Sequence, residues 1–165
     1  MKIHLSFVCF LMLFSITLSS QNKMPNVILK TIEGKTVNSK STSNKNGLTI
    51  YSFWATWCVP CINELDAINK DFDKWKLETN VKLVAVSTDD ARTKRRVRPL
   101  VNGKKWNFDV LVDENQAFKR ALNINGIPHT IVTKGSKIIY RKIGYKPGEE
   151  EDLYKFILKN SPIKN

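Results

Sequence analysis

Cys58 and Cys61 are the residues whose types and spacing most clearly allow chemistry in this sequence. An apolar, β-branched run from Leu48 to Trp54 precedes them, and an amphipathic helical pattern from Val59 to Glu78 follows. This order predicts a buried strand, a tight turn and a helix with Cys58 at its entrance. The N–H groups and dipole of a helix N-terminus stabilise a thiolate, and Cys-x-x-Cys thiols there have pKa values of about 3.5–7.5. The spacing therefore predicts an attacking sulfur on Cys58 and a resolving sulfur on Cys61.

The N-terminal segment has the pattern of a secretory signal peptide at residues 1–20. Lys2 is followed by an apolar run from Leu5 to Leu18, and small residues precede Gln21. Because the run is about 14 residues, shorter than the ~20 that span a bilayer, we expect cleavage before Gln21. Residues 21–165 would then form one domain, exported across the inner membrane to the periplasm, or membrane-anchored if the signal stays uncleaved. Cleavage leaves two of the three cysteines, which favours a chemical rather than a structural pair.

The charge balance is strongly basic, with 27 basic and 15 acidic residues and a formal net charge of +12. Such a balance is compatible with nucleic acid, anionic lipid or acidic protein partners. The basic residues are nevertheless scattered along the chain, except between Arg92 and Arg98, which we interpret as a solvated helix surface. No platform of aromatic and basic residues accompanies them, so we expect no nucleic-acid binding.

The rest of the sequence predicts the elements that must hold the cysteine turn. Strands and helices alternate, which predicts an α/β sandwich with a mixed sheet whose first strand–helix units pair in parallel. The Thr88–Asp90 segment is expected to cap the helix that follows it, and Asp113 the next one. The expected strands are 26–31, 35–38, 48–54, 82–87, 108–112, 129–133 and 137–143, and the expected helices are 59–78, 91–101, 113–122 and 149–159.

Over about residues 25–160 the sequence resembles the thioredoxin superfamily, most closely its secreted branch related to TlpA and ResA. The segment Phe53–Cys61 is similar to the family's active-site strand and turn, and Gly126–Pro128 to its cis-proline loop, so we expect Pro128 in cis. Residues 89–113 correspond to the helix–strand insertion of this branch. The resemblance implies a thioredoxin-like three-layer sandwich, with a mixed central sheet flanked by helices, an N-terminal β-hairpin and a central helix–strand insertion.

The resemblance also implies roles for individual residues. Cys58 and Cys61 match the attacking and resolving cysteines, so a redox-active Cys58–Cys61 disulfide is expected, with no other cofactor and no metal. Glu64 matches a buried carboxylate that assists proton transfer at the dithiol, and its position three residues after Cys61 puts it on the same side of a helix. The implied substrate-binding positions are Trp57, Pro60, Ile127 and Pro128.

Three positions depart from the family pattern. One is Asp66, two residues after Glu64, where many relatives have a proline. Ser52 stands where cytoplasmic thioredoxins carry an Asp, so that proton acceptor is absent. His129 follows the proline where Thr is frequent. Its imidazole could lie near the sulfurs and tune them or point into solvent, and we expect it to be non-essential.

We therefore predict a cell-envelope thiol–disulfide oxidoreductase that reduces protein disulfides by dithiol exchange through Cys58 and Cys61. Its expected partners are disulfide-containing or dithiol proteins and a membrane electron donor, and we expect a monomer. A thiol peroxidase stays open as an alternative, although peroxiredoxins place the reactive thiol in a different local sequence. A copper- or metal-binding module also stays open, with His129 as the obvious additional ligand. Covalent haem is excluded, because Ile62 stands where the haem motif needs His.

Overall fold

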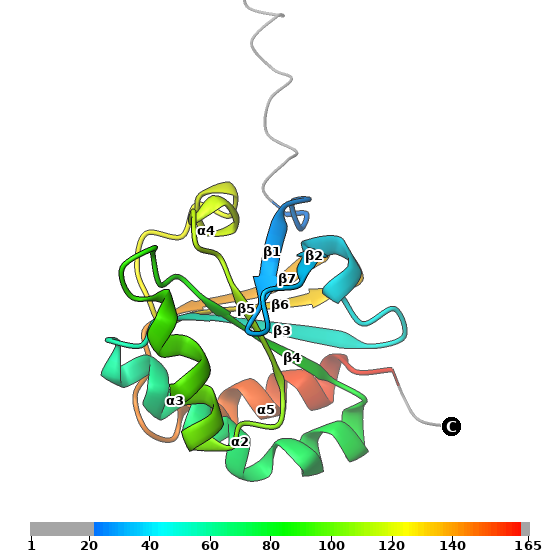
Figure 1. The fold of residues 1–165 in the computed structure, drawn as a ribbon. Coiled ribbons are helices and arrows are strands. Elements are labelled where there is room, and N and C mark those ends of the chain that lie inside the picture. Colours follow the sequence, from blue (N-terminus) through cyan, green and yellow to red (C-terminus); the bar gives the residue numbers. More distant parts are fainter. Residues whose placement is uncertain (1–21, 163–165) are drawn as a thin grey trace, which may run out of the picture.

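The computed structural model describes residues 22–162, so the expected signal peptide at residues 1–20 lies outside the described residues. A mixed seven-stranded sheet, in the order β2-β1-β5-β4-β3-β6-β7, forms the middle of the molecule (Figure 1). The strands are β1 (Ile28–Thr31), β2 (Thr36–Asn38), β3 (Leu48–Trp54), β4 (Lys82–Ser87), β5 (Asp109–Val112), β6 (His129–Lys134) and β7 (Lys137–Ile143). The helices are η1 (Ser39–Thr42), α2 (Val59–Thr79), η2 (Lys94–Arg96), α3 (Val97–Lys104), α4 (Ala117–Ala121) and α5 (Glu149–Asn160).

Strand β3 lies at the centre of the architecture. All seven of its residues are buried, as a run with apolar residues on both faces requires. It pairs in parallel with β4 and antiparallel with β6. The sequence predicted these bounds and the parallel pairing, and both are confirmed. The turn that carries Cys58 therefore leaves the sheet from its most enclosed strand.

Helices cover both faces of the sheet, which confirms the predicted three-layer α/β sandwich. Figure 1 shows α2, α3 and α5 on one side and α4 on the other. The first side buries the apolar stripe of α2, including Leu65, Ile68 and Phe72, in one large core. The second side buries Phe118 of α4 in a smaller core against Tyr51 and Phe53 of β3. Each face of β3 thus contributes to a separate core.

The predicted insertion between β4 and β6 consists of η2, α3 and β5, and β5 joins the sheet between β4 and β1. The helix expected at residues 91–101 begins later, at Val97. The Asp90 carboxylate accepts hydrogen bonds from the N–H groups of Arg92 (2.9 Å) and Thr93 (3.3 Å), so these residues form a tight turn instead. Pro99 is compatible with α3 because the first turn of a helix needs no intrahelical N–H donor.

Helix α4 is shorter than the predicted helix at residues 113–122. The backbone N–H of Gln116 donates to the carbonyl of Asp113 at 2.7 Å and closes a turn, so the helix begins only at Ala117. The expected capping by Asp113 is nevertheless present, because its carboxylate accepts the N–H groups of Phe118 (3.1 Å) and Lys119 (2.8 Å).

The two outer strands of the sheet are protected in different ways. At one edge β2 is only three residues long. At the other edge the segment from Asn22 to Met24 runs beside the start of β7, where Ile138 donates its N–H to Asn22 and Met24 donates its N–H to Ser136, both at 2.8 Å. Within residues 22–162, none of the helices has the length and apolar character needed to cross a membrane.

Candidate active site

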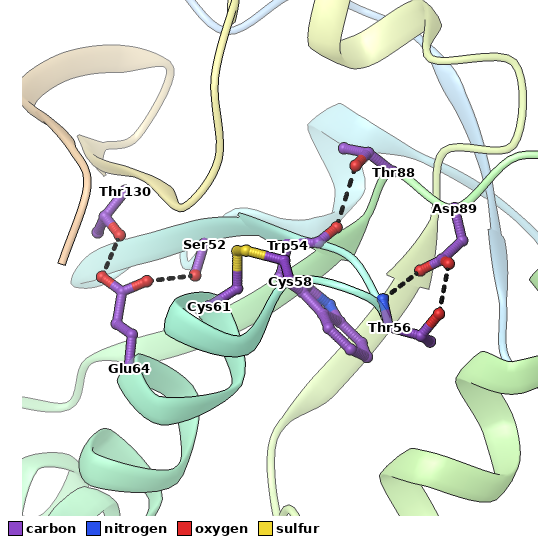
Figure 2. The surroundings of a disulfide bond; sticks show 9 residues. All are labelled: Ser52, Trp54, Thr56, Cys58, Cys61, Glu64, Thr88, Asp89 and Thr130. Atoms are coloured by element: carbon purple, nitrogen blue, oxygen red, sulfur yellow. Dashed lines mark hydrogen bonds between the residues drawn. A yellow bond between two sulfur atoms is a disulfide. The ribbon is translucent and has the colours of Figure 1, made fainter. Parts of the chain in front are cut away.

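Cys58 and Cys61 form a disulfide at the N-terminus of α2, with their Cα atoms 5.3 Å apart (Figure 2). Cys58 is the N-cap residue of the helix, and its side chain makes no capping hydrogen bond. Cys58 is 6% exposed, whereas Cys61 is fully buried. A sulfur that meets another protein must reach the surface, so this difference in exposure favours the predicted order, with Cys58 attacking and Cys61 resolving.

The first turn of α2 favours a thiolate on Cys58 once the disulfide is reduced. Pro60 lies in this turn, where its missing N–H costs no intrahelical bond, and no acidic residue is present there to oppose the helix dipole. The N–H groups at a helix N-terminus have no partner within the helix and are available to a negatively charged group. The local structure therefore supplies the electrostatic environment that the sequence predicted.

A buried hydrogen-bond network fixes the turn that carries Cys58 (Figure 2). The carboxylate of Asp89, which is fully buried, accepts bonds from the Thr56 N–H at 2.8 Å and the Thr56 hydroxyl at 2.6 Å. The Ser87 hydroxyl donates to the same carboxylate at 2.8 Å, and Thr88 donates its N–H to the Trp54 carbonyl at 2.8 Å. The prediction that Asp89 helps cap a helix is wrong, because its carboxylate faces the turn before Cys58.

Glu64 is buried on α2, on the side of the helix that carries the disulfide (Figure 2). Thr130 donates its hydroxyl to one carboxylate oxygen at 2.7 Å, and Ser52 donates to the other at 3.1 Å. Burial raises the pKa of Glu64 above its usual range, and the two hydroxyl donors oppose this rise without cancelling it. A carboxyl group in this environment keeps its proton to a higher pH than an exposed glutamate does.

The loop before β6 lies beside the active-site turn. The Ile127–Pro128 peptide bond is cis, which confirms the expectation, and the Pro128 carbonyl accepts the N–H of Gly144 at 2.8 Å. The next residue, His129, pairs with Phe53 near the end of β3. Ile127 also packs against the core cluster that contains both cysteines. The structure therefore brings the predicted cis-proline loop to the end of α2 that carries the disulfide.

Exposed apolar side chains surround this site. Trp57 is 61% exposed and Val59 is 65% exposed, and Pro60 is also exposed. Ile143, which was not predicted from the sequence, ends β7 opposite His129 and is 69% exposed. In the sequence it looked like the last residue of an ordinary strand, so no signal distinguished it.

His129 occupies neither of the two positions considered from the sequence. Its side chain is 3% exposed, and neither ring nitrogen has a hydrogen-bond partner in the described part of the chain. Successive strand residues face opposite sides, and Thr130 faces Glu64, so His129 faces the α4 side, away from α2. Burial, together with the positive charge of Arg141, lowers the pKa of His129 to about 4.

A closed metal site needs several His, Cys, Asp or Glu ligands that converge on one point. Within residues 22–162 no group of three or more His, Cys, Asp or Glu side chains is arranged to hold a metal ion. His129 faces the other side of the sheet from the cysteines, so it is not placed to complete a site with them.

Comparisons with known proteins agree with this geometry. Residues 20–142 match the model of the AhpC/TSA family. Thiol-disulfide oxidoreductase ResA of Bacillus thuringiensis (strain Al Hakam) is 28% identical over 131 residues, which is 79% of this chain and 73% of the relative. A thioredoxin-like protein from Porphyromonas gingivalis is 40% identical with a TM-score of 0.74, covering 86% of this chain and 93% of that one. StoA from Bacillus subtilis is 26% identical with a TM-score of 0.64, covering 80% and 97%.

Proposed function

The chain belongs to the AhpC/TSA family and is a thiol–disulfide oxidoreductase, and from this premise we propose that it reduces the disulfides of other proteins in the cell envelope. The observation that carries the proposal is the Cys58–Cys61 pair at the entrance of α2, in which Cys58 keeps a small exposed area and Cys61 is fully buried. Such a pair can exchange its disulfide with a partner without a further cofactor.

The proposed reaction begins with the reduced pair. The Cys58 thiolate attacks a substrate disulfide, forms a mixed disulfide and releases one substrate sulfur as a thiolate, which takes up a proton. The Cys61 thiol then loses its proton, attacks the mixed disulfide and releases the second substrate sulfur, while the Cys58–Cys61 bond forms. Glu64 is the candidate acceptor for the Cys61 proton, because its carboxylate lies on the same side of α2 as the disulfide and its raised pKa makes it a stronger base than an exposed glutamate.

The proposed substrate surface is the apolar rim around Cys58. Trp57 and Pro60 offer exposed side chains on the α2 side, and the loop before β6 adds the partly buried Ile127 and the buried Pro128. The Ile127 backbone precedes the paired residues of β6, so it is placed to pair with an extended segment of the substrate.

The proposed compartment and partners follow from the sequence. Residues 1–20 have the signal pattern that would export the domain at 21–165, and the periplasm is the compartment in which protein disulfides persist. The Cys58–Cys61 disulfide formed in each cycle must be reduced again, so we propose a membrane electron donor. We further propose that the protein works as a monomer.

Trapping with Cys61→Ala tests this proposal. Without the resolving thiol, the mixed disulfide on Cys58 should persist, and mass spectrometry of the trapped adducts should identify protein substrates. Cys58→Ala is the matched control and should trap far less. Equal trapping by both variants would reverse the two roles.

A second assay separates the oxidoreductase from the peroxidase alternative. The reduced protein is offered insulin or hydrogen peroxide in parallel, and we expect turnover of the insulin disulfides only. Rapid peroxide turnover with inert insulin would contradict the proposed function.

A further inference from the structure

A groove with a basic rim opens between β1, β5 and the η2–α3 segment. It encloses about 300 Å³, and its lining includes the apolar residues Ile32, Val97 and Val112. Three cationic side chains line it, Lys30 from β1, Lys94 from η2 and Arg98 from α3. We call this feature, together with the adjoining Arg95 and Arg96, the cationic groove.

The part of the cationic groove beside Lys30 and Val112 lies at the same end of the sheet as the disulfide, and the rest of the groove follows β1 away from that end. Val112 is the last residue of β5 and pairs with Ser87, the last residue of β4. Ser87 and Thr56 both donate to the Asp89 carboxylate, and Thr56 lies two residues before Cys58. Strand β5 is the second neighbour of β3, which corresponds to a separation of about 10 Å at ordinary strand spacing. A protein seated on Cys58 would therefore extend over the groove.

Most of the positive charge at the groove has no local counterpart. Arg95, Arg96 and Arg98 are exposed, and among residues 22–162 none of them forms an ion pair. Lys94 pairs with Glu114 at 2.5 Å. Glu33 also lies nearby, and its pKa is lowered chiefly by the Thr31 hydroxyl and, more weakly, by Arg98 and Lys35. Asp90, whose carbonyl accepts the N–H of Lys94, is already paired with Arg92. The groove thus keeps a net positive charge around an apolar floor.

We propose that the cationic groove binds an acidic segment of the partner protein whose disulfide reacts with Cys58. This inference rests on the proposed function and specifies its substrate class. A carboxylate-bearing segment complements the free arginines, and an apolar side chain within it would fill the floor formed by Ile32, Val97 and Val112. A flat lipid surface would meet Arg95 and Arg96 but would leave the concave floor unfilled, so we favour a protein segment over a membrane.

If the groove binds an acidic segment, the association rate should depend on the charge of the substrate. Opposite charges near a reactive site raise association rates by about 10–10³-fold, and salt weakens the effect steeply. The attraction should act on the encounter and leave the chemistry of the Cys58–Cys61 pair unchanged. It should therefore change kcat/KM for acidic substrates and leave neutral substrates unaffected.

Two matched peptides test the proposal. Both contain the same small disulfide loop, and one carries a tail of alternating Glu and Leu while the other carries Gln and Leu. Arg95→Glu/Arg98→Glu reverses the charge of the groove. Lys45→Glu/Lys134→Glu is the control, because both lysines are exposed and Lys134 pairs with Leu48 at the opposite end of β3. The readout is kcat/KM for peptide reduction at low and high salt, with the full protein.

We expect the wild type and the control to reduce the acidic peptide at least tenfold faster than the neutral one at low salt, and the advantage to vanish at high salt. The groove variant should lose the advantage while reducing the neutral peptide at the wild-type rate. Equal rates for both peptides with the wild type, or an equal loss in the control, would overturn the inference. Binding of the wild type to vesicles of phosphatidylglycerol and phosphatidylcholine, lost in the groove variant and without any peptide preference, would replace it with a membrane role. Failure to reduce even the neutral peptide would contradict the proposed function itself.

Discussion

At the scale of single residues, Glu64 combines burial with polar partners that carry no charge. Its carboxylate accepts the hydroxyls of Ser52 and Thr130, and among the described residues it forms no ion pair. Two neutral donors do not replace the hydration that the ionised form would have in water, so the protonated form is favoured. The Glu64 carboxyl therefore binds its proton more tightly than an exposed glutamate does.

Glu64→Gln should slow disulfide reduction and remove the part of its pH dependence that comes from the Glu64 carboxyl group. We expect the step that takes the proton from Cys61 to become about 10–100-fold slower at neutral pH, because an amide accepts no proton there. The measurement is single-turnover reduction of a peptide disulfide between pH 5 and 9. Asp71→Asn changes an exposed carboxylate of the same helix and should leave the profile unaltered. An unchanged profile in Glu64→Gln would remove Glu64 from the mechanism.

The same substitution should also change how the stability of the fold depends on pH. The folded-state pKa of Glu64 lies above its ordinary value of 4.5, so the folded state holds the proton more tightly than the unfolded state. Its stabilising contribution is complete below pH 4.5 and is lost as pH rises through the folded-state pKa. Denaturant unfolding of the oxidised protein should therefore show that Glu64→Gln gains stability relative to the wild type as the pH is raised through the folded-state pKa of Glu64.

His129 should have the opposite effect on stability. Its pKa is about 4 in the folded state against 6.5 in the unfolded state, so the unfolded state binds the proton first. The wild type should lose stability as pH falls from 6.5 to about 4, and His129→Leu should lose less. The leucine also removes two unpaired ring nitrogens, so we expect a gain on the order of 1 kcal/mol at pH 7. Unfolding midpoints at several pH values check this, and parallel curves for both proteins would contradict it.

At the scale of elements, the active-site turn is held by the segment that follows β4. Asp89 follows β4, and its carboxylate binds Thr56 in the turn between β3 and α2. Strands β3 and β4 are parallel, so their C-terminal residues lie at the same end of the sheet. The position of Cys58 therefore depends on a residue more than thirty positions away in sequence, as the separation of 33 between Thr56 and Asp89 shows.

Asp89→Ala should loosen that turn. It leaves the donors of Thr56 and Ser87 without their acceptor, and we expect a loss of about 3 kcal/mol in the free energy of unfolding. The rate at which reduced Cys58 reacts with iodoacetamide should also change, since the turn no longer fixes the sulfur at the helix entrance. Asp90→Ala, at the exposed neighbour turn, should change that rate little. An equal effect of both variants would show that the network has no special role.

The elements differ in how far the sequence predicts them. The strand from Leu48 to Trp54 and the helix from Val59 follow from local pattern, because apolar periodicity and the cysteine motif both mark them. The start of α3 and the length of α4 depend on Asp90 and Gln116 closing turns, which propensity alone does not distinguish from helix. At the site, the cysteines and Glu64 are close in sequence, whereas Asp89 and Thr130 reach it only through tertiary contacts.

At the scale of the whole molecule, the sheet separates two cores. The face toward α2 carries the reactive pair and Glu64, and the face toward α4 carries Phe118, Tyr51 and Phe53. The Phe118 ring centroid lies 6.0 Å from that of Tyr51 and 5.4 Å from that of Phe53. The second core therefore supports β3 from behind, and the reacting groups do not face it.

Phe118→Ala should lower the stability of the fold without slowing disulfide exchange. We expect a loss of about 3–5 kcal/mol in the free energy of unfolding, because a fully buried aromatic ring is removed. The rate of disulfide exchange should stay at the wild-type value at temperatures where the variant remains folded. Leu158→Ala, at a residue 44% exposed on α5, should cost much less. A slower exchange in folded Phe118→Ala would show that the two faces are coupled.

The protected outer strands also bear on what happens when this molecule meets a misfolded chain. Unpaired strand borders are templates for intermolecular pairing, and partly unfolded polypeptides supply the complementary segments. Here β2 is too short to propagate such pairing, and residues 22–24 occupy the start of β7, whose other residues include Arg141 and Lys142. Neither border thus offers a long unpaired strand from which intermolecular β-sheet growth could start.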